Sequence, residues 1–503
     1  MKLAVAHIKQ QFGGWLPFLI AVLLGLVLAR LSPVQGALLV GGTAVFLLTF
    51  IQPLIGLAVT LLLGPLGAWE ALFLGPTPLD SGQILLLLTL AAWLARGLRD
   101  RRLTIPRTPL LLPLSLFAYV ALLSLLAAPS FTAGLRELLK WGEIALVLLL
   151  VIDEASRLRQ AHWYLLGALC LAGVTQAMLG IWQFGLRGDG PEHFLVLGRF
   201  YRAFGTFMQP NPFGGFMNLT LLLALGALAG SVKWVKWEER RGKREEGGER
   251  REEGGRWGLV WRPLSLVLAV VVVLTGVGLV ASWSRGAWLG AVAGTAVLVL
   301  FFPQKRWHGI GLALIVGVAA VAVLGVGIYF NRLPTSIVER VTSSFSDDLR
   351  FDDVRGIDIT NDNYAVLERL AHWQAALGMA RDHVWLGVGF GNYEAAYPDY
   401  RLINWADALG HAHNYYLNLL AEVGVLGFLA YCLFWTAVFW QNILLLQRLE
   451  WPERGIALGL LAVWTALTVH HLVDKLYVNN IYVHLGVLLG LQQILWGTEA
   501  SHS

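Results

Sequence analysis

The chain has 503 residues, of which 56% are hydrophobic and 14% charged, and its formal net charge is +5. Soluble domains carry about 25% charged residues, and disordered chains lack this aliphatic and aromatic content. A water-soluble multidomain enzyme and a disordered protein are therefore both excluded. In a membrane protein, excess Lys and Arg mark cytoplasmic loops, so the basic charge predicts no nucleic-acid partner. The two cysteines, Cys170 and Cys432, lie in apolar blocks and predict neither a disulfide nor a metal site.

Apolar blocks of roughly 17–22 residues, the length of a helix that crosses about 30 Å of hydrocarbon, recur along the chain. They predict an all-α, polytopic integral membrane protein with about 12–14 transmembrane helices. The first block is interpreted as an uncleaved span, because a signal-peptide core would be shorter. Blocks 35–50 and 52–64 are short enough to form a hairpin or one interrupted helix. The blocks lie near 13–31, 35–50, 52–64, 83–98, 108–128, 139–152, 161–184, 213–231, 263–282, 287–303, 309–330, 415–438, 456–474 and 480–497.

Basic residues in the connecting segments give the orientation. Segments 96–107 and 233–262 and the pair Lys305-Arg306 are rich in Lys and Arg, which places them in the cytoplasm by the positive-inside rule. The stretch 233–262 is dense in charge and glycine, so we interpret it as a charged cytoplasmic linker that is partly disordered or helical. Both termini are expected in the cytoplasm.

Counting spans from the linker orients three regions of interest. One span separates Arg202 from the linker, one separates the linker from Arg285, and two more lead from Arg285 to the segment 331–414. Arg202, Arg285 and 331–414 should therefore share the non-cytoplasmic side. The chain divides into transmembrane helices over 1–330, an extracytoplasmic loop over 331–414 and C-terminal transmembrane helices over 415–503.

The extracytoplasmic loop begins with an acidic stretch and continues with a helical pattern. Apolar residues at three-to-four spacing predict a helix near 364–383. The following Gly387-Val-Gly389-Phe-Gly391 lacks the preceding strand of a nucleotide site, so it is interpreted as a turn. The acidic residues are Asp347, Asp348, Asp352, Asp353, Asp358 and Asp362.

Two arginines on the outer side suggest an anionic ligand. Arg202 lies among aromatic residues just before a span, where an interfacial arginine that reaches lipid phosphates is the alternative. Arg285 occupies a very tight outer turn between two apolar spans, and a cation at membrane depth is costly. Because a guanidinium binds phosphate in a bidentate way, the pair favours an anionic lipid headgroup.

Two histidines stand where the extracytoplasmic loop re-enters the membrane. His411 and His413 at i, i+2 are separated on a helix and have no cysteine nearby, so no metal is expected. An interfacial histidine is often structural, but a neutral imidazole there could instead accept a proton at physiological pH. The histidines precede Asn414 and, further on, Gly424 and Gly427.

These segments resemble the O-antigen ligase/polymerase superfamily of bacterial membrane glycosyltransferases. His413-Asn414, nine residues and then Gly424-x-x-Gly427 is similar to that family's His-Asn-x9-Gly-x-x-Gly signature. Upstream, Glu368-Arg369 with Trp373, and Leu386 to Asn392, resemble its periplasmic helix and glycine turn. Arg202 with Gly205-Thr-Phe and Asn211 resembles its first arginine region, and Ser284-Arg285-Gly286 its second. The resemblance covers about 195–440, and the insert at 233–262 is longer than the family leads us to expect.

The resemblance implies a helical fold of the GT-C kind in the bacterial cytoplasmic membrane, with its active site on the outer face. Such enzymes transfer a glycan from undecaprenyl diphosphate to an acceptor hydroxyl on a glycan, lipid or protein, without cofactor, nucleotide or metal. Independently, a diphosphate leaving group needs fixed cations. We therefore assign Arg202 and Arg285 to the diphosphate, and His413 to accepting the hydroxyl proton or orienting the hydroxyl. His411 leaves the identity of the key histidine open.

Further residues and functions stay open at this point. Asn211 could begin a helix or bind sugar, and Asn414 could fix His413 or contact glycan. Arg369, Tyr415 and Asp474 are weaker candidates for lining the cavity, with packing as the alternative for Asp474. Ligase, polymerase and protein O-oligosaccharyltransferase share these residues. A transporter for an anion or a lipid-linked glycan is the rival class, but no repeated halves are visible.

Overall fold

The computed structural model describes residues 29–75, 79–101, 105–158, 160–244, 251–329, 353–360 and 363–500, with Leu19, Val22 and Gly25 before them. Most of the expected first span at 13–31 therefore lies outside the described residues. The same holds for Asp347, Asp348, Asp352 and Asp362 of the acidic stretch.

The first half of the chain folds into helices joined by short turns. Gln52 has extended backbone angles because the residue before a proline disfavours the helical region, so blocks 35–50 and 52–64 form two separate helices that pack together. Asp80 accepts a hydrogen bond from the Gln83 backbone and begins the following helix as a capping box. The elements are α2 (Pro33–Ile51), α3 (Pro53–Leu63), η1 (Gly64–Leu66), α4 (Gly67–Leu74), α5 (Ser81–Arg99), α6 (Leu111–Ser124), η2 (Leu125–Ala127), α7 (Phe131–Ala155) and α8 (Ala161–Gly185).

The second half adds a small hairpin, long helices and an outer helical segment. The charged linker is helical on both sides of 245–250, since α9 runs through Arg244 and α10 begins at Arg251. The helix expected near 364–383 is confirmed as α14. The elements are η3 (Glu192–Phe194), β1 (Leu195–Val196), β2 (Phe200–Tyr201), α9 (Pro210–Arg244), α10 (Arg251–Ala281), α11 (Arg285–Phe301), α12 (Arg306–Tyr329), α14 (Tyr364–Asp382), α15 (Tyr393–Tyr400), α16 (Tyr415–Arg448), α17 (Glu453–His470) and α18 (Ile481–Ala500).

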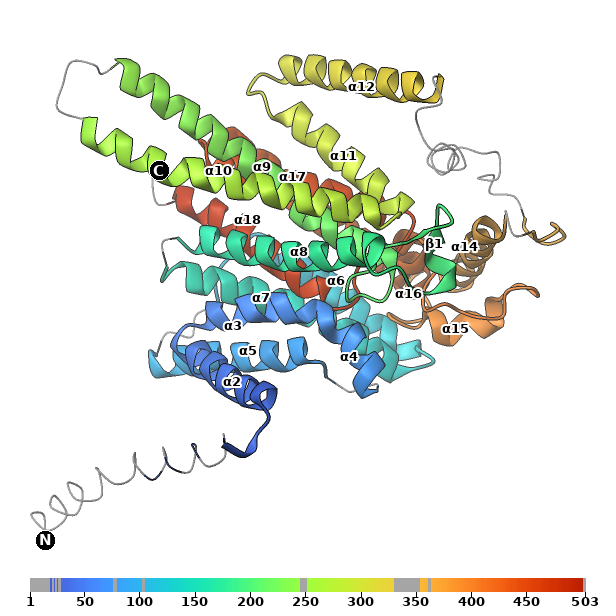
Figure 1. Ribbon diagram of the computed structural model, residues 1–503. Helices are drawn as coiled ribbons and strands as arrows, with labels where there is room; N and C mark the ends of the chain where they lie inside the picture. Colours follow the sequence, from blue (N-terminus) through green and yellow to red (C-terminus); the bar gives the residue numbers. More distant parts are fainter. Residues whose placement is uncertain are drawn as a thin grey trace, which may run out of the picture.

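The bundle has two distinct ends. α9 and α10 point toward the linker at one end, whereas β1, α14 and α15 gather at the opposite end (Figure 1). We call these the linker end and the site end. Gly230 of α9 lies against Pro452, just before α17, so α17 runs from the linker end back to the site end.

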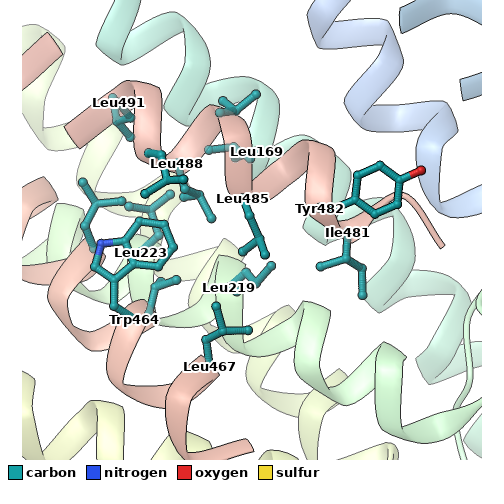
Figure 2. Packing of buried hydrophobic residues seen from close by; sticks show 14 of the residues in the cluster. Leu169, Leu219, Leu223, Trp464, Leu467, Ile481, Tyr482, Leu485, Leu488 and Leu491 are labelled. Carbon is teal, nitrogen blue, oxygen red and sulfur yellow. The ribbon is translucent and has the colours of Figure 1, made fainter. Parts of the chain in front are cut away.

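A large apolar core joins α8, α9, α17 and α18 (Figure 2). Close packing there depends on small residues: a Cβ at Gly226 of α9 would overlap the backbone of Gly455 and Gly459 of α17. Such small-residue contacts drive helix association in membranes, where lipid offers no hydrophobic force. A buried amide also joins the helices, because Trp464 Nε1 donates to Gln492 Oε1 at 2.8 Å. The residues labelled in Figure 2 are Leu169, Leu219, Leu223, Trp464, Leu467, Ile481, Tyr482, Leu485, Leu488 and Leu491.

Helix length and composition support membrane insertion. Within the described residues, seven helices are long and apolar enough to cross a membrane. Shorter apolar helices cover Leu111–Ala127, Arg285–Phe301, Trp307–Ala319 and Ile481–Gly497. The predicted all-α, polytopic class is confirmed, and the number of crossings, about 12–14, stays a prediction.

Candidate functional site

Arg202 is held at the site end by the hairpin and by α10. Its backbone N–H donates to Phe194 O, and the next residue, Ala203, donates to Ala281 O, each at 2.9 Å. The guanidinium Nε then donates to the carbonyl oxygen of Ser282 at 3.0 Å. These contacts place the Arg202 side chain beside the tight turn between α10 and α11.

Asn211 links the two arginine segments. Its side-chain Oδ1 accepts one hydrogen bond from Arg202 Nη2 at 3.3 Å and another from Ser284 Oγ at 2.9 Å. Ser284 is the N-cap of α11, where its hydroxyl accepts from the Ala287 backbone, and Arg285 is the first residue of that helix. Asn211 does lie in the first turn of α9, but its Oδ1 orients Arg202 and Ser284 across the turn.

Arg285 lies beside the end of α17. A Cβ at the next residue, Gly286, would sit 3.0 Å from His470 Cδ2 and 2.5 Å from Val473 Cγ2. Only a residue without a side chain allows α11 to approach this closely. The start of α11 therefore contacts the segment that leads to Asp474.

Arg369, on α14, adds a third guanidinium to the same region. Its charge acts electrostatically on Arg285, on His413 and on His470. The three groups belong to α11, to the loop before α16 and to α17. Arg369 therefore connects the arginine side of the site electrostatically with the histidine side.

Three glycines after α14 form a turn that contacts α16 and joins the outer helices α14 and α15 to it. Gly387, Gly389 and Gly391 have φ of +67°, +107° and +70°, which confirms the expected turn. Two backbone hydrogen bonds of 2.9 Å then join the turn to α16, from Val388 N to Ala421 O and from Gly389 N to Glu422 O.

Gly424 completes this docking contact. It has φ +61°, which interrupts α16, and a Cβ there would overlap the backbone of Trp385 and Leu386. The nine residues between Asn414 and Gly424 span about 13 Å of helix. The spacing therefore fixes α14, and Arg369 on it, relative to His413.

His413 has an unusual backbone conformation and a partly buried ring. Its φ is +52°, which is uncommon for a residue with a side chain. The ring centroid lies 4.5 Å from that of His411 and 5.7 Å from that of His372. The buried His413 Nε2 has no hydrogen-bond partner within the described part of the chain. Burial, together with the charges of His411, Arg369 and His372, lowers the pKa of His413 to about 3.

His411, the other histidine, is paired with Asp474. The distance from His411 Nε2 to Asp474 Oδ1 is 2.9 Å, although the residues are 63 positions apart. Burial alone would raise the pKa of Asp474, but the hydrogen bond from His411 and the nearby histidine charges lower it below its ordinary value. The candidate Asp474 therefore lies in contact with the histidine pair.

The same three residues bring potential metal-ligand atoms together. The nearest such atoms of His411, His413 and Asp474 all lie within 4.8 Å of one another. Asp474 is already ion-paired to His411, and the charge of Arg369 reaches His413. Positive charge beside the group disfavours a cation, so the donor set alone does not make this a metal site.

Asn414 and Tyr415 have structural contacts. Asn414 is the N-cap of α16, and its Oδ1 accepts from the backbones of Tyr416 and Leu417. Tyr415 is completely buried, its backbone N–H donates to His471 O at 2.8 Å, and Tyr477 packs against its ring. These contacts fix the start of α16 directly after the two histidines.

Sequence reasoning missed a buried charge cluster beneath the site. Glu137 of α7 forms ion pairs with Lys140 at 2.7 Å and with Lys475 at 2.9 Å. Glu422 of α16 interacts electrostatically with Lys475 and accepts a hydrogen bond from the Tyr393 backbone at 3.2 Å. Charged residues next to or within apolar blocks were the available signal.

Comparison with known protein families finds a match within the chain. Residues 269–432 match the family model for O-antigen ligase. The chain carries an O-antigen ligase domain. The domain contains Arg285, Arg369, His411 and His413, and the resemblance to the superfamily is confirmed. No curated protein matches the chain.

The family match and the apolar helices together describe the chain in general terms. The chain is a multi-pass membrane protein, and its residues 269–432 match the O-antigen ligase family. Arg202, Asn211 and Asp474 lie outside the matched range and are joined to the domain by the contacts described above.

Proposed function

We propose that the protein is a membrane glycosyltransferase that moves an oligosaccharide or polysaccharide from undecaprenyl diphosphate to an acceptor hydroxyl. The reaction takes place on the outer face of the bacterial cytoplasmic membrane, with both termini on the cytoplasmic side. The observation that carries the proposal is the meeting of Arg202 and Arg285 with Arg369 and the two histidines at one end of the bundle.

The chemistry of the donor explains why such a site needs cations. The bond from the anomeric carbon to the diphosphate breaks while the acceptor oxygen attacks from the opposite face. Negative charge develops on the leaving diphosphate, and preorganised guanidinium groups stabilise it. Arg202 and Arg285 hold the diphosphate, and His413 accepts the hydroxyl proton or orients the hydroxyl. A single displacement inverts the configuration, and no step of it requires a metal.

The acceptor defines three versions of this function. A lipid A-core or other envelope acceptor makes the protein a ligase, a growing glycan makes it a polymerase, and a serine or threonine makes it a protein O-oligosaccharyltransferase. We favour the ligase. The extracytoplasmic region 331–414 is of moderate size, and no domain is appended to it.

Reconstitution tests the proposal. Proteoliposomes are supplied with radiolabelled lipid-linked glycan and each acceptor, and the label is followed into lipid, polymer or protein. Arg285→Ala should lower transfer by on the order of 10²–10³, and His413→Ala should also lower it strongly. Arg381→Ala, an exposed arginine at the end of α14, is the matched control and should transfer normally. Near wild-type transfer by both site variants would remove the assignment.

The same vesicles distinguish the transferase from a transporter. Uptake of a small anion by proteoliposomes without any polyprenyl substrate would favour transport. The proposal expects no uptake above that of empty vesicles. Movement of intact lipid-linked glycan, with no label in any acceptor, would likewise contradict the transferase.

A further inference from the structure

Within the described residues, Asp474 is the carboxylate that pairs with one of the two histidines ahead of α16. His411 Nε2 lies 2.9 Å from Asp474 Oδ1, and this oxygen also accepts from the Lys475 backbone at 2.8 Å. The carboxylate is therefore held by its own segment and fixes the His411 ring in turn. The side chain of His411 is 19% exposed, whereas that of Asp474 is 8% exposed. The imidazole is thus partly exposed, whereas its carboxylate partner is buried.

The pairing defines which nitrogen of His411 carries the proton. An ionised carboxylate only accepts hydrogen bonds, so the Nε2 that faces it is the protonated nitrogen. The lone pair of a neutral His411 is then on Nδ1, and Nδ1 has no hydrogen bond within the described part of the chain. A base held by a carboxylate beside a hydroxyl is the arrangement that activates nucleophiles in many hydrolases.

His413 differs in its hydrogen bonding and in its pKa. Its Nε2 is buried without a partner in the described residues, and its pKa is lowered to about 3. General bases work best when their pKa is near the operating pH. His413 is therefore a weak proton acceptor, but its fixed ring is suited to orienting a group through a hydrogen bond.

We infer that His411, oriented by Asp474, is the catalytic base for the acceptor hydroxyl, and that His413 is a positioning residue. The inference rests on the proposed function. The acceptor O–H transfers its proton to His411 Nδ1, and its oxygen forms the new bond to the anomeric carbon. The bond from that carbon to the diphosphate breaks, and the diphosphate leaves with the electron pair. Asp474 stabilises the imidazolium that forms.

Charged and titratable groups on neighbouring segments surround His411 and Asp474. The Arg369 guanidinium, whose charge acts on His413, adds positive charge to this group. The groups are His413 on the same loop, His372 and Arg369 on α14, His470 at the end of α17, and Asp474 and Lys475 in the segment after α17.

Transfer rates as a function of pH test the roles of the two histidines. In the wild type, kcat falls as the pH falls and the base becomes protonated. His411→Gln should lower kcat by roughly 10²–10⁴-fold and leave a residual rate that no longer falls at acid pH. His413→Gln, the matched control, should lower the rate but keep the acid limb. Loss of the acid limb in His413→Gln and its retention in His411→Gln would overturn the inference.

Chemical modification supplies a readout that needs no transfer activity. Diethyl pyrocarbonate acylates neutral, accessible imidazole nitrogen, and mass spectrometry locates the product in the purified wild-type protein. His411 should react faster than His413, and Asp474→Asn should move the pH midpoint of His411 modification to lower pH, because the neighbouring anion is lost. Faster reaction at His413, or an unchanged midpoint, would contradict the inference. If neither the wild type nor any variant transfers glycan, the proposed function fails. The pairing of His411 with Asp474 is still supported if His411 is modified at the expected rate and with the expected pH midpoint.

Discussion

Gly286 lies directly against His470: a Cβ at Gly286 would sit 3.0 Å from Cδ2 and 3.1 Å from Nε2 of that ring. The contact joins the segment that carries Arg285 to the segment that carries Asp474. Asn211 extends the connection to Arg202 through Ser284. The cations and the histidines of the site thus depend on one tight approach between α11 and α17.

Substitution of Gly286 tests whether this approach positions the site. Gly286→Ala forces Val473 and His470 to move and shifts Arg285, so transfer should fall by roughly tenfold or more, since small displacements of positioning groups are costly. Gly142→Ala is the control because nothing lies within 4 Å of a Cβ there. Equal transfer rates for the two variants would show that the approach is not needed.

Gly424→Ala tests the docking of the outer segment on α16. A left-handed backbone costs a side-chain residue about 1–2 kcal/mol, and here the new Cβ also overlaps the backbone of Trp385 and Leu386. Gly410→Ala separates the two effects, because Gly410 has φ +77° and open space around it. The midpoint of thermal unfolding in detergent should fall further for Gly424→Ala than for Gly410→Ala. Equal losses would contradict the packing argument.

Asn211→Asp tests the link between the arginines. A carboxylate at this position would pair with the Arg202 guanidinium and compete with the donor diphosphate. The KM for lipid-linked glycan should rise by about tenfold, the effect of about 1.4 kcal/mol, and Asn211→Ala should change it less. A KM that is higher for Asn211→Ala than for Asn211→Asp would indicate that alignment matters more than charge.

Much of this site follows from local sequence, and the rest depends on distant contacts. The helix of α14, the glycine turn and the start of α16 at Asn414 were predictable because their signals lie within a few residues. Counting the spans on either side of the charged linker also predicted that Arg202, Arg285 and α14 share one end of the molecule.

The missing parts are contacts between residues far apart in sequence. His411 and Asp474 are 63 residues apart, and Asn211 and Ser284 are 73 apart. Local propensity favoured a helix start for Asn211. In the structure, its side-chain oxygen instead accepts hydrogen bonds from Arg202 and Ser284. The pairing of Glu137 with Lys475 likewise required the packed structure, because no spacing rule connects α7 with the segment after α17.

Stability should depend on pH through His372 and His413, two histidines near the site whose pKa values are lowered. Burial lowers the pKa of His372 to about 4, and the pKa of His413 is about 3, against about 6.5 for an unfolded histidine. The unfolded state binds more protons between these values, so stability is constant above about pH 6.5 and falls as the pH drops toward 4. Asp474 adds no pH dependence in this window, because its carboxyl group is ionised there in both the folded and the unfolded state.

The thermal midpoint between pH 7.5 and 5 measures this effect. The wild type should lose stability on acidification, and a His372→Asn/His413→Asn double variant should lose less. A midpoint that rises on acidification, or an equal loss in both proteins, would contradict the assignment of buried neutral imidazoles.

Metal removal should leave the reaction unchanged. Asp474 is ion-paired to His411, and the cationic charge of Arg369 reaches His413, so a divalent cation is disfavoured there. Transfer in proteoliposomes should be the same with EDTA as with added Mg²⁺ or Mn²⁺. Loss of activity in EDTA that is restored by one metal would assign the group of His411, His413 and Asp474 to that ion.

The most direct measurement is a density map of the protein with a non-hydrolysable lipid-linked glycan bound. The account predicts that the diphosphate lies between Arg202 and Arg285, with the anomeric carbon turned toward the histidines before α16. A diphosphate bound away from both arginines, or on the linker side of the bundle, would contradict it.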